Sequence, residues 1–231
     1  MDAIDEPSRP DAEPAPETRA ATPSVTAVVV AHEPGEWFEE TIDSLVTQDY
    51  PRLDIMVIDG AGEHDLAERL RKVAPAATLL DASDTTGFAA AANTAMETDL
   101  TSAFLLICHD DVALAPDAVR TLVTESLRSN AGITGPKLVA WDYPEQLQHV
   151  GLVADRFAVT SEVVDSAELD QEQYDTVTDV FVVPTACLLV RTTLFRELSG
   201  YDPVITRRGE DVDLCWRAQL RGARVIVAPD A

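Results

Sequence analysis

From residue 25 onwards, short apolar runs alternate with stretches whose apolar residues recur at helical spacing. Residues 25–31 form a valine-rich and almost unbroken apolar run, which is typical of a strand buried on both faces. Residues 36–49 follow it and place their apolar side chains on one helical face. The same alternation predicts further strands at 54–59, 77–81 and 103–108, and helices at 63–73, 87–96 and from Pro116 onwards.

This order of elements predicts an α/β fold with a mainly parallel central sheet and helices on both faces. In such sheets, ligands bind just beyond the carboxyl ends of the strands. The polar residues that follow the strands are therefore expected to converge on one site. They are His32, Glu33, Asp59, Asp84, His109, Asp110 and Asp111.

The second half of the chain is less regular. Residues 132–140 and 179–190 are each predicted as one strand, residues 210–220 as a helix and residues 223–228 as a last strand. Residues 162–179 contain seven acidic residues and no Lys or Arg, which favours a mobile surface excursion. The sequence ends three residues after the last predicted strand, so we expect it to be a shortened piece of its domain.

Residues 1–24 differ from the rest in composition. Five prolines stand there among Ala, Glu and Asp, so the segment buries too little apolar surface to offset its ordering entropy. We predict a disordered tail over residues 1–24 and a folded domain over residues 25–231.

The charge of the chain excludes some partners. Its 41 acidic and 17 basic residues give a formal net charge of −24, and such a surface repels nucleic acid and anionic lipid. A small phosphorylated substrate stays possible if a metal ion or a helix N-terminus neutralises it locally. Adaptation for solubility or high salt is an equally good explanation of the acidity.

Neither the cysteines nor the N-terminus indicates export. Cys108, Cys187 and Cys215 are odd in number and far apart, without the spacing of a metal site, so we interpret them as buried thiols. No signal peptide is recognisable, and no run reaches the roughly 18 apolar residues of a membrane span. We expect a soluble, cytoplasmic domain.

The triplet His109-Asp110-Asp111 directly follows an apolar strand. Adjacent carboxylates repel each other unless a cation or hydrogen-bond donors compensate, and Mg²⁺ is commonly held by one or two carboxylates plus substrate phosphates. The alternative is a solvated turn with an aspartate that caps the next helix, near Pro116 and Asp117.

Two other acidic groups lie where chemistry is expected. Glu210 and Asp211 open a helix after Gly209, so one of them can act as a general base on a bound hydroxyl, although helix capping would also explain one acid. Asp213 is expected to pair with Arg217 on the next turn. Asp59 ends a strand, the natural place for a carboxylate that contacts a ribose or a base, but the glycines after it are also compatible with a bare turn.

Taken together, these segments resemble the inverting family 2 glycosyltransferases of the GT-A fold. The resemblance runs over residues 25–231, and its most specific part is GYDPVITRRGEDVDLCWRAQLRGARVIVAPDA at residues 200–231. Residues 54–65 resemble the strand that ends in the base-contacting aspartate. Residues 85–96 (TTGFAAAANTAM) resemble the segment that carries a glycine and an asparagine, here Gly87 and Asn93.

The resemblance implies a role for each candidate residue. Asp111 and His109 would hold Mg²⁺ or Mn²⁺, and His109 stands where the family commonly has an aspartate. Asp211 would be the catalytic base, with Glu210 orienting the acceptor. The implied contacts to a nucleotide-sugar donor come from His32, Glu33, Asp59, Gly87, Asn93 and Asp110.

The implied reaction transfers a sugar, with inversion, to a glycan or lipid-linked acceptor. Residues 25–115 would form the nucleotide-binding half and residues 116–231 an acceptor-side half that is not complete. In a longer parent protein, segments outside this chain would place the enzyme at the inner face of the cell membrane. The alternative is a non-catalytic domain of the same fold that binds nucleotide sugars or serves as a scaffold. A sugar-phosphate nucleotidyltransferase is disfavoured because residues 31–37 contain no basic, glycine-rich phosphate loop.

Overall fold

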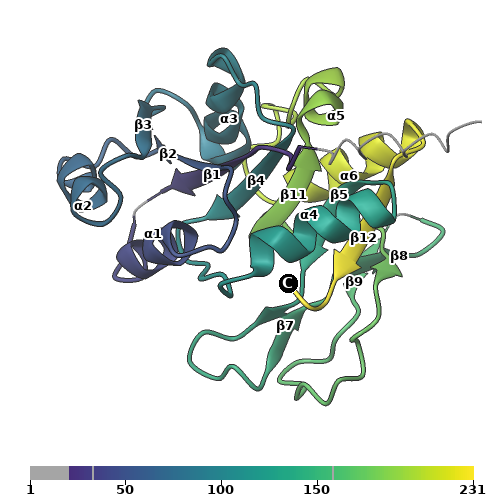
Figure 1. Ribbon diagram of the computed structural model, residues 1–231. Helices are drawn as coiled ribbons and strands as arrows, with labels where there is room; N and C mark the ends of the chain where they lie inside the picture. Colours follow the sequence, from purple (N-terminus) through teal and green to yellow (C-terminus); the bar gives the residue numbers. More distant parts are fainter. Residues whose placement is uncertain (1–20, 33, 158) are drawn as a thin grey trace, which may run out of the picture.

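The computed structural model describes residues 21–32, 34–157 and 159–231, and an eight-stranded sheet runs through its centre (Figure 1). Its strand order is β10-β12-β5-β11-β4-β1-β2-β3. Neighbours among β1 (Val25–Ala31), β2 (Leu53–Asp59), β3 (Thr78–Asp81) and β4 (Phe104–His109) pair in parallel. β11 (Cys187–Arg191) is antiparallel to β4 and to β5 (Ala131–Pro136), β12 (Arg224–Ala228) is parallel to β5, and β10 (Thr178–Asp179) is antiparallel to β12. The predicted mainly parallel sheet is confirmed.

Helices cover both faces of this sheet, as predicted. Side chains of β1 alternate between two cores, so that Val29 enters one and Val30 the other. One face carries α1 (Phe38–Val46), α2 (Leu66–Val73) and α4 (Ala118–Arg128). The other carries α3 (Gly87–Asn93), the 3₁₀ turn η1 (Thr94–Glu97), α5 (Thr192–Glu197) and α6 (Glu210–Leu220).

Two predicted strands are wrong in extent. The run 132–140 divides at Pro136 into β5 and β6 (Leu138–Val139), and β6 pairs with β7 (Leu147–His149) instead of the main sheet. The run 179–190 divides into β10 and β11, because residues 180–183 cross from one partner to another. Val180 N donates to Val225 O (3.0 Å), whereas Val182 N donates to Leu152 O (3.1 Å). Residues 179–190 are largely apolar because successive parts of the segment are buried against different neighbours, and not because they form one long strand.

A small lobe projects from the sheet and contains β7, β8 (Leu152–Ala154) and β9 (Thr160–Glu162) (Figure 1). Most of the acidic segment 162–179 belongs to it, and the segment ends in β10 of the main sheet. Val164 packs with Leu147 and Val150, and Lys137 Nζ lies 2.7 Å from Asp170 Oδ2 and 2.8 Å from Asp175 Oδ1. The predicted excursion is therefore anchored to the end of β5 by Lys137, which lies outside the acidic segment itself.

The predicted tail is too long at its C-terminal end. Arg52 Nη1 donates to Thr22 O (2.7 Å), Tyr50 Oη to Pro23 O (2.7 Å) and Ala103 N to Ser24 O (2.9 Å). Residues 22–24 thus belong to the folded domain, and the tail prediction for residues 1–20 lies outside the described residues.

The three cysteines are free and buried, as expected. In the part of the chain that the structure describes, no helix has both the length and the apolar character needed to cross a bilayer.

Candidate active site

The residues that follow β1, β2 and β4 meet at one edge of the sheet, as predicted. Ala31 is in register with Asp59, and Val30 with His109. The backbone N–H of His32 donates to Asp110 Oδ2 at 3.0 Å, which joins the ends of β1 and β4 directly. Glu33, the neighbouring predicted donor contact, lies outside the described residues.

Asp59 shapes the loop that follows it. Its Oδ1 accepts hydrogen bonds from the backbone N–H groups of Ala61 (3.2 Å), Gly62 (2.7 Å) and Glu63 (3.2 Å). The residue is only 8% exposed. One carboxylate oxygen is thus committed to the turn, and the other is left for a contact to a ligand.

Asp110 and Asp111 have different surroundings although they are adjacent. Asp110 is half-buried; its carboxylate accepts from His32 and its carbonyl accepts from Thr41 Oγ1 at 3.0 Å. Burial raises the pKa of Asp110, against the lowering effect of the hydrogen bond from His32. The side chain of Asp111 is 58% exposed. Asp110 therefore holds the strand ends together, whereas Asp111 faces outward.

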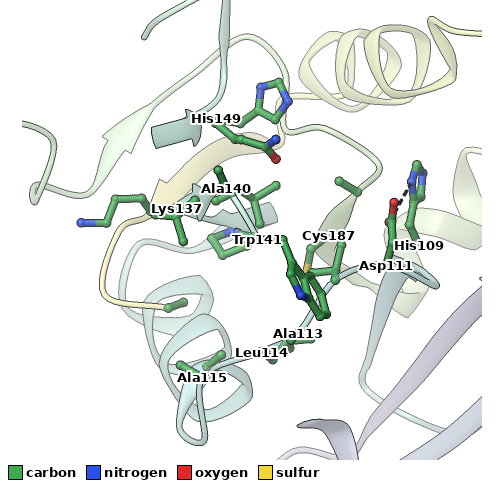
Figure 2. Close-up of a pocket in the computed structure, with 18 of the residues that line it drawn as sticks. His109, Asp111, Ala113, Leu114, Ala115, Lys137, Ala140, Trp141, His149 and Cys187 are labelled. Carbon is green, nitrogen blue, oxygen red and sulfur yellow. Dashed lines mark ion pairs between the residues drawn. The ribbon is translucent and has the colours of Figure 1, made fainter. Parts of the chain in front are cut away.

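His109 lies beside Asp111, with its Nδ1 3.9 Å from Asp111 Oδ1 (Figure 2). Its ring packs against Phe88 at a centroid distance of 4.7 Å, and its buried Nε2 has no hydrogen-bond partner in the part of the chain that the structure describes. A cation at ordinary ligand distances of about 2.1 Å can contact both the imidazole and the carboxylate. Among the described residues, no group of three or more His, Cys, Asp or Glu side chains could hold a metal ion. A cation held by this pair would take its remaining ligands from a bound phosphate, and the metal site itself stays a prediction.

The first turn of α6 carries the predicted base. Gly209 precedes it with φ +102°, a conformation that favours glycine. Burial raises the pKa of Asp211; the N–H of Val212 opposes this shift, Glu210 adds to it, and His109 is close enough to lower it. The structure thus brings His109, at the end of β4, close to the first turn of α6.

Glu210 is held on one side by a threonine. Its Oε1 accepts a hydrogen bond of 3.4 Å from Thr185 Oγ1, and its buried Oε2 has no hydrogen-bond partner among the described residues. The buried hydroxyl of Tyr201 also lacks a partner. Phe88 packs against Tyr201 at 5.9 Å as well as against His109. Phe88 and Tyr201 were not among the predicted site residues, although both lie inside the segments that carry the resemblance.

Gly87 and Asn93 support the site from behind. Gly87 has φ +82°, and a Cβ there would lie 2.5 Å from Thr206 O, so only glycine lets α3 approach the loop before α6. Both polar atoms of the Asn93 amide are bonded to the backbone of Tyr201. These contacts position α3 against the loop before α6 and against Tyr201, and the donor contact expected of both residues stays a prediction.

A cavity of about 580 Å³ begins at His109 and Asp111 and extends between the start of α4 and β6–β7 (Figure 2). Trp37 and Trp141 both line it, and their rings make an edge-to-face contact at 6.4 Å. Aliphatic side chains of Leu114, Leu122 and Leu138 form much of its wall. The sequence places Trp37 on a helix face and gives no indication that Trp141 meets it.

Comparison with known families and proteins agrees with this geometry. The family model described as "Glycosyltransferase like family 2" matches residues 23–231. The O-antigen biosynthesis protein RfbC of Myxococcus xanthus is 24% identical in an alignment of 216 residues that covers 89% of this chain and 16% of that protein. A pre-mycofactocin glycosyltransferase of Mycobacterium tuberculosis is 42% identical over 52 residues, 22% of this chain and 11% of that protein. The chain thus spans a small part of these relatives.

Solved structures share the fold. Mannosyltransferase PcManGT from Pyrobaculum calidifontis, in complex with GDP-Man and Mn²⁺, aligns with a TM-score of 0.66 and 19% identity over 95% of this chain and 58% of its own. TarS 1-349 of S. aureus in complex with UDP aligns with a TM-score of 0.64 and 15% identity over 90% of this chain and 58% of its own. At these identities the likeness establishes a GT-A glycosyltransferase fold.

Proposed function

The chain belongs to the family 2-like glycosyltransferases, and from this premise we propose that it transfers a sugar from a nucleotide-sugar donor to a glycan or lipid-linked acceptor. The transfer inverts the anomeric carbon and depends on Mg²⁺ or Mn²⁺. The observation that carries the proposal is the position of His109, at the end of β4, close enough to Asp211 in α6 to lower its pKa. Asp111 faces outward at the end of β4, and Asp211 lies in the first turn of α6 with His109 near it.

The nucleotide lies on the side of β1 and β2. His32 and the free oxygen of Asp59 contact the nucleoside, while Asp110 fixes the backbone that presents His32. The contact from Glu33 stays a prediction. Gly87 and Asn93 act indirectly, through the loop and the tyrosine that they hold in place.

Asp111 and His109 would hold the divalent cation, and the bound cation would neutralise charge on the leaving diphosphate. The carboxylate of Asp211 accepts the proton of the acceptor hydroxyl as the hydroxyl oxygen bonds to the anomeric carbon and the bond to the diphosphate oxygen breaks. Attack from the face opposite the leaving group inverts that carbon. Glu210, held by Thr185, orients the acceptor.

The neighbours named above support the donor class, since one was solved with GDP-Man and Mn²⁺ and another with UDP. For the whole protein we propose action at the inner face of the cell membrane, anchored by segments outside this chain. The rival function, a non-catalytic nucleotide-sugar-binding or scaffolding domain, predicts binding without turnover.

Calorimetry with UDP, GDP and dTDP tests the proposal, followed by hydrolysis of the matching nucleotide sugars. We expect binding of at least one nucleotide in Mn²⁺ or Mg²⁺ that EDTA abolishes, and slow release of free sugar. Binding that persists undiminished in EDTA would contradict the metal assignment. Binding without hydrolysis or transfer would favour the scaffold.

A further inference from the structure

Most of the cavity between α4 and β6–β7 has no part in the donor and metal binding proposed above. It shares His109 and Asp111 with the candidate active site, but none of His32, Asp59, Glu210 and Asp211 lines it. It therefore begins where the donor diphosphate is expected and leads away from the nucleoside side of the sheet. A molecule that fills it would reach the reaction centre with one end.

Two tryptophans give the cavity a surface suited to a flat apolar face. Trp37 is 42% exposed and Trp141 is half-buried, and their rings meet at an interplanar angle of 67°. They come from separate segments, since Trp37 precedes α1 and Trp141 follows β6. Indole rings that line a cavity and keep apolar surface exposed to water are typical of a binding surface.

The charges around the cavity select against an anionic occupant. Lys137 is the one Lys or Arg among the described residues that line it, and its ammonium is already paired with Asp170 and Asp175. Lys137 lies on the side of the cavity opposite His109 and Asp111 (Figure 2). His149 is likewise occupied, because its Nδ1 lies 2.8 Å from Glu162 Oε2. The polar groups that no role above uses are the carboxylate of Glu40 and the amide of Gln148, which suit hydroxyl groups.

We propose that this cavity binds the uncharged saccharide part of the acceptor, with the apolar face of a sugar ring against Trp37 and Trp141. The proposal rests on the glycosyl transfer proposed above and adds the chemical class of the acceptor to it. A volume of about 580 Å³ lies within the range of ordinary ligand pockets. Mixed aliphatic and hydroxyl-binding walls match a sugar, whose ring presents C–H groups on its faces and hydroxyls at its rim.

The test uses the protein with Trp141→Ala, Trp37→Ala, and Trp216→Ala as a matched control. Trp216 is 45% exposed, packs against Phe181 from α6 and does not line the cavity. Acceptors are a panel of methyl glycosides and neutral disaccharides, offered with the nucleotide sugar that the chain hydrolyses. Both cavity variants are expected to raise the acceptor KM roughly tenfold and to shift the partition from transfer towards hydrolysis, with partial recovery in Trp141→Phe. Trp216→Ala is expected to keep the wild-type KM.

A second measurement does not need turnover. In Trp216→Phe the only remaining tryptophans line the cavity, so a saccharide of the panel should change the intrinsic fluorescence saturably, and Trp141→Ala should remove most of that change. The proposal is overturned if no neutral saccharide is bound or glycosylated, or if the cavity variants keep the wild-type acceptor KM. It is also overturned if sugar phosphates bind better than neutral sugars, or if octyl glycosides bind much more tightly than the corresponding methyl glycosides. Loss of nucleotide binding and donor hydrolysis in the wild type would refute the proposed function itself.

Discussion

The side-chain amide of Asn93 is hydrogen-bonded at both ends to the backbone of Tyr201. Asn93 Nδ2 donates to Tyr201 O at 2.8 Å, and Tyr201 N donates to Asn93 Oδ1 at 2.9 Å. The contact fastens the end of α3 to the turn after α5. Gly200 makes the approach possible, because a Cβ there would lie 2.3 Å from Asn93 Oδ1. Tyr201 in turn packs against Phe88, which also contacts His109.

Replacing Asn93 should destabilise the domain and disturb the packing of Tyr201 that supports the candidate active site. Asn93→Ala removes two hydrogen bonds and leaves backbone groups without partners, so we expect a loss of about 2–3 kcal/mol. In a domain of this size that corresponds to a fall in Tm of about 4–12 °C, measured by calorimetry. Asn93→Asp keeps the acceptor for Tyr201 N but loses the donor, and should fall between alanine and wild type. An unchanged Tm in Asn93→Ala would contradict the positioning role.

Two glycines with nearly the same backbone conformation separate strain from steric contact. Gly87 has φ +82° and Gly222 has φ +80°, but only at Gly87 would a Cβ meet another atom, Thr206 O at 2.5 Å. Gly222→Ala should cost only the left-handed backbone penalty, about 1–2 kcal/mol. Gly87→Ala should cost more and lower the transfer rate, because the loop before Gly209 must move. Equal losses of stability in urea unfolding would contradict this contact.

The first half of the fold could be predicted from the sequence because one strand followed by one helix repeats there. β1 and β4 are buried on both faces, and this leaves apolar runs that pattern alone can locate. The second half could not be predicted as well, because its apolar runs do not belong to single strands. Residues 179–190 serve β12, β8 and β4 in turn.

The site was predictable where its residues follow strands and less so where tertiary contacts decide their use. His109 lies beside Asp111 at the end of β4 and near Asp211 at the start of α6, and the roles predicted for these residues stay predictions. That Asp110 turns inward to His32, that Asn93 is used up by Tyr201, and that Trp37 meets Trp141 depend on pairs far apart in the sequence. No local pattern encodes such pairs.

Asp111→Ala should abolish the metal-dependent part of nucleotide binding without loss of stability. The side chain is 58% exposed, so its removal costs the fold little. Isothermal titration with Mn²⁺ is expected to show little or no binding of the nucleotide that the wild type prefers, while the Tm stays the same. Asp142→Ala is the control, since it also removes one exposed carboxylate from a chain of net charge −24. If metal-dependent binding persists in Asp111→Ala, the cation must be held by other ligands.

Asp211→Asn should make the protein more stable at neutral pH. Burial raises the folded-state pKa of Asp211 above its unfolded value, so the folded state holds this proton more tightly. The corresponding stability is present at low pH and is lost as the pH rises through the folded pKa. Asparagine cannot ionise, and the Tm of the variant should exceed that of the wild type at pH 7. The difference should shrink as the pH falls into the range where Asp211 is protonated.

The same substitution should nearly abolish turnover, because a base must be ionised and asparagine cannot accept the proton. We expect kcat to fall about 10²–10⁴-fold while the affinity for nucleotide and metal is kept. In the wild type, kcat should begin to fall with decreasing pH above the pH range in which an ordinary aspartate is protonated, since the pKa of Asp211 is raised.

Asp213→Asn is the matched control. Asp213 accepts a hydrogen bond from Arg217 Nε at 2.8 Å, the pair that the sequence predicted, and Arg217 Nη1 donates to Leu198 O at 2.8 Å. That control should lower the Tm and leave most of the turnover, because Asp213 holds the turn after α5 and not the acceptor. If Asp211→Asn retains most of its rate, the base must be sought at Glu210, whose Oε2 is buried beside it without a partner.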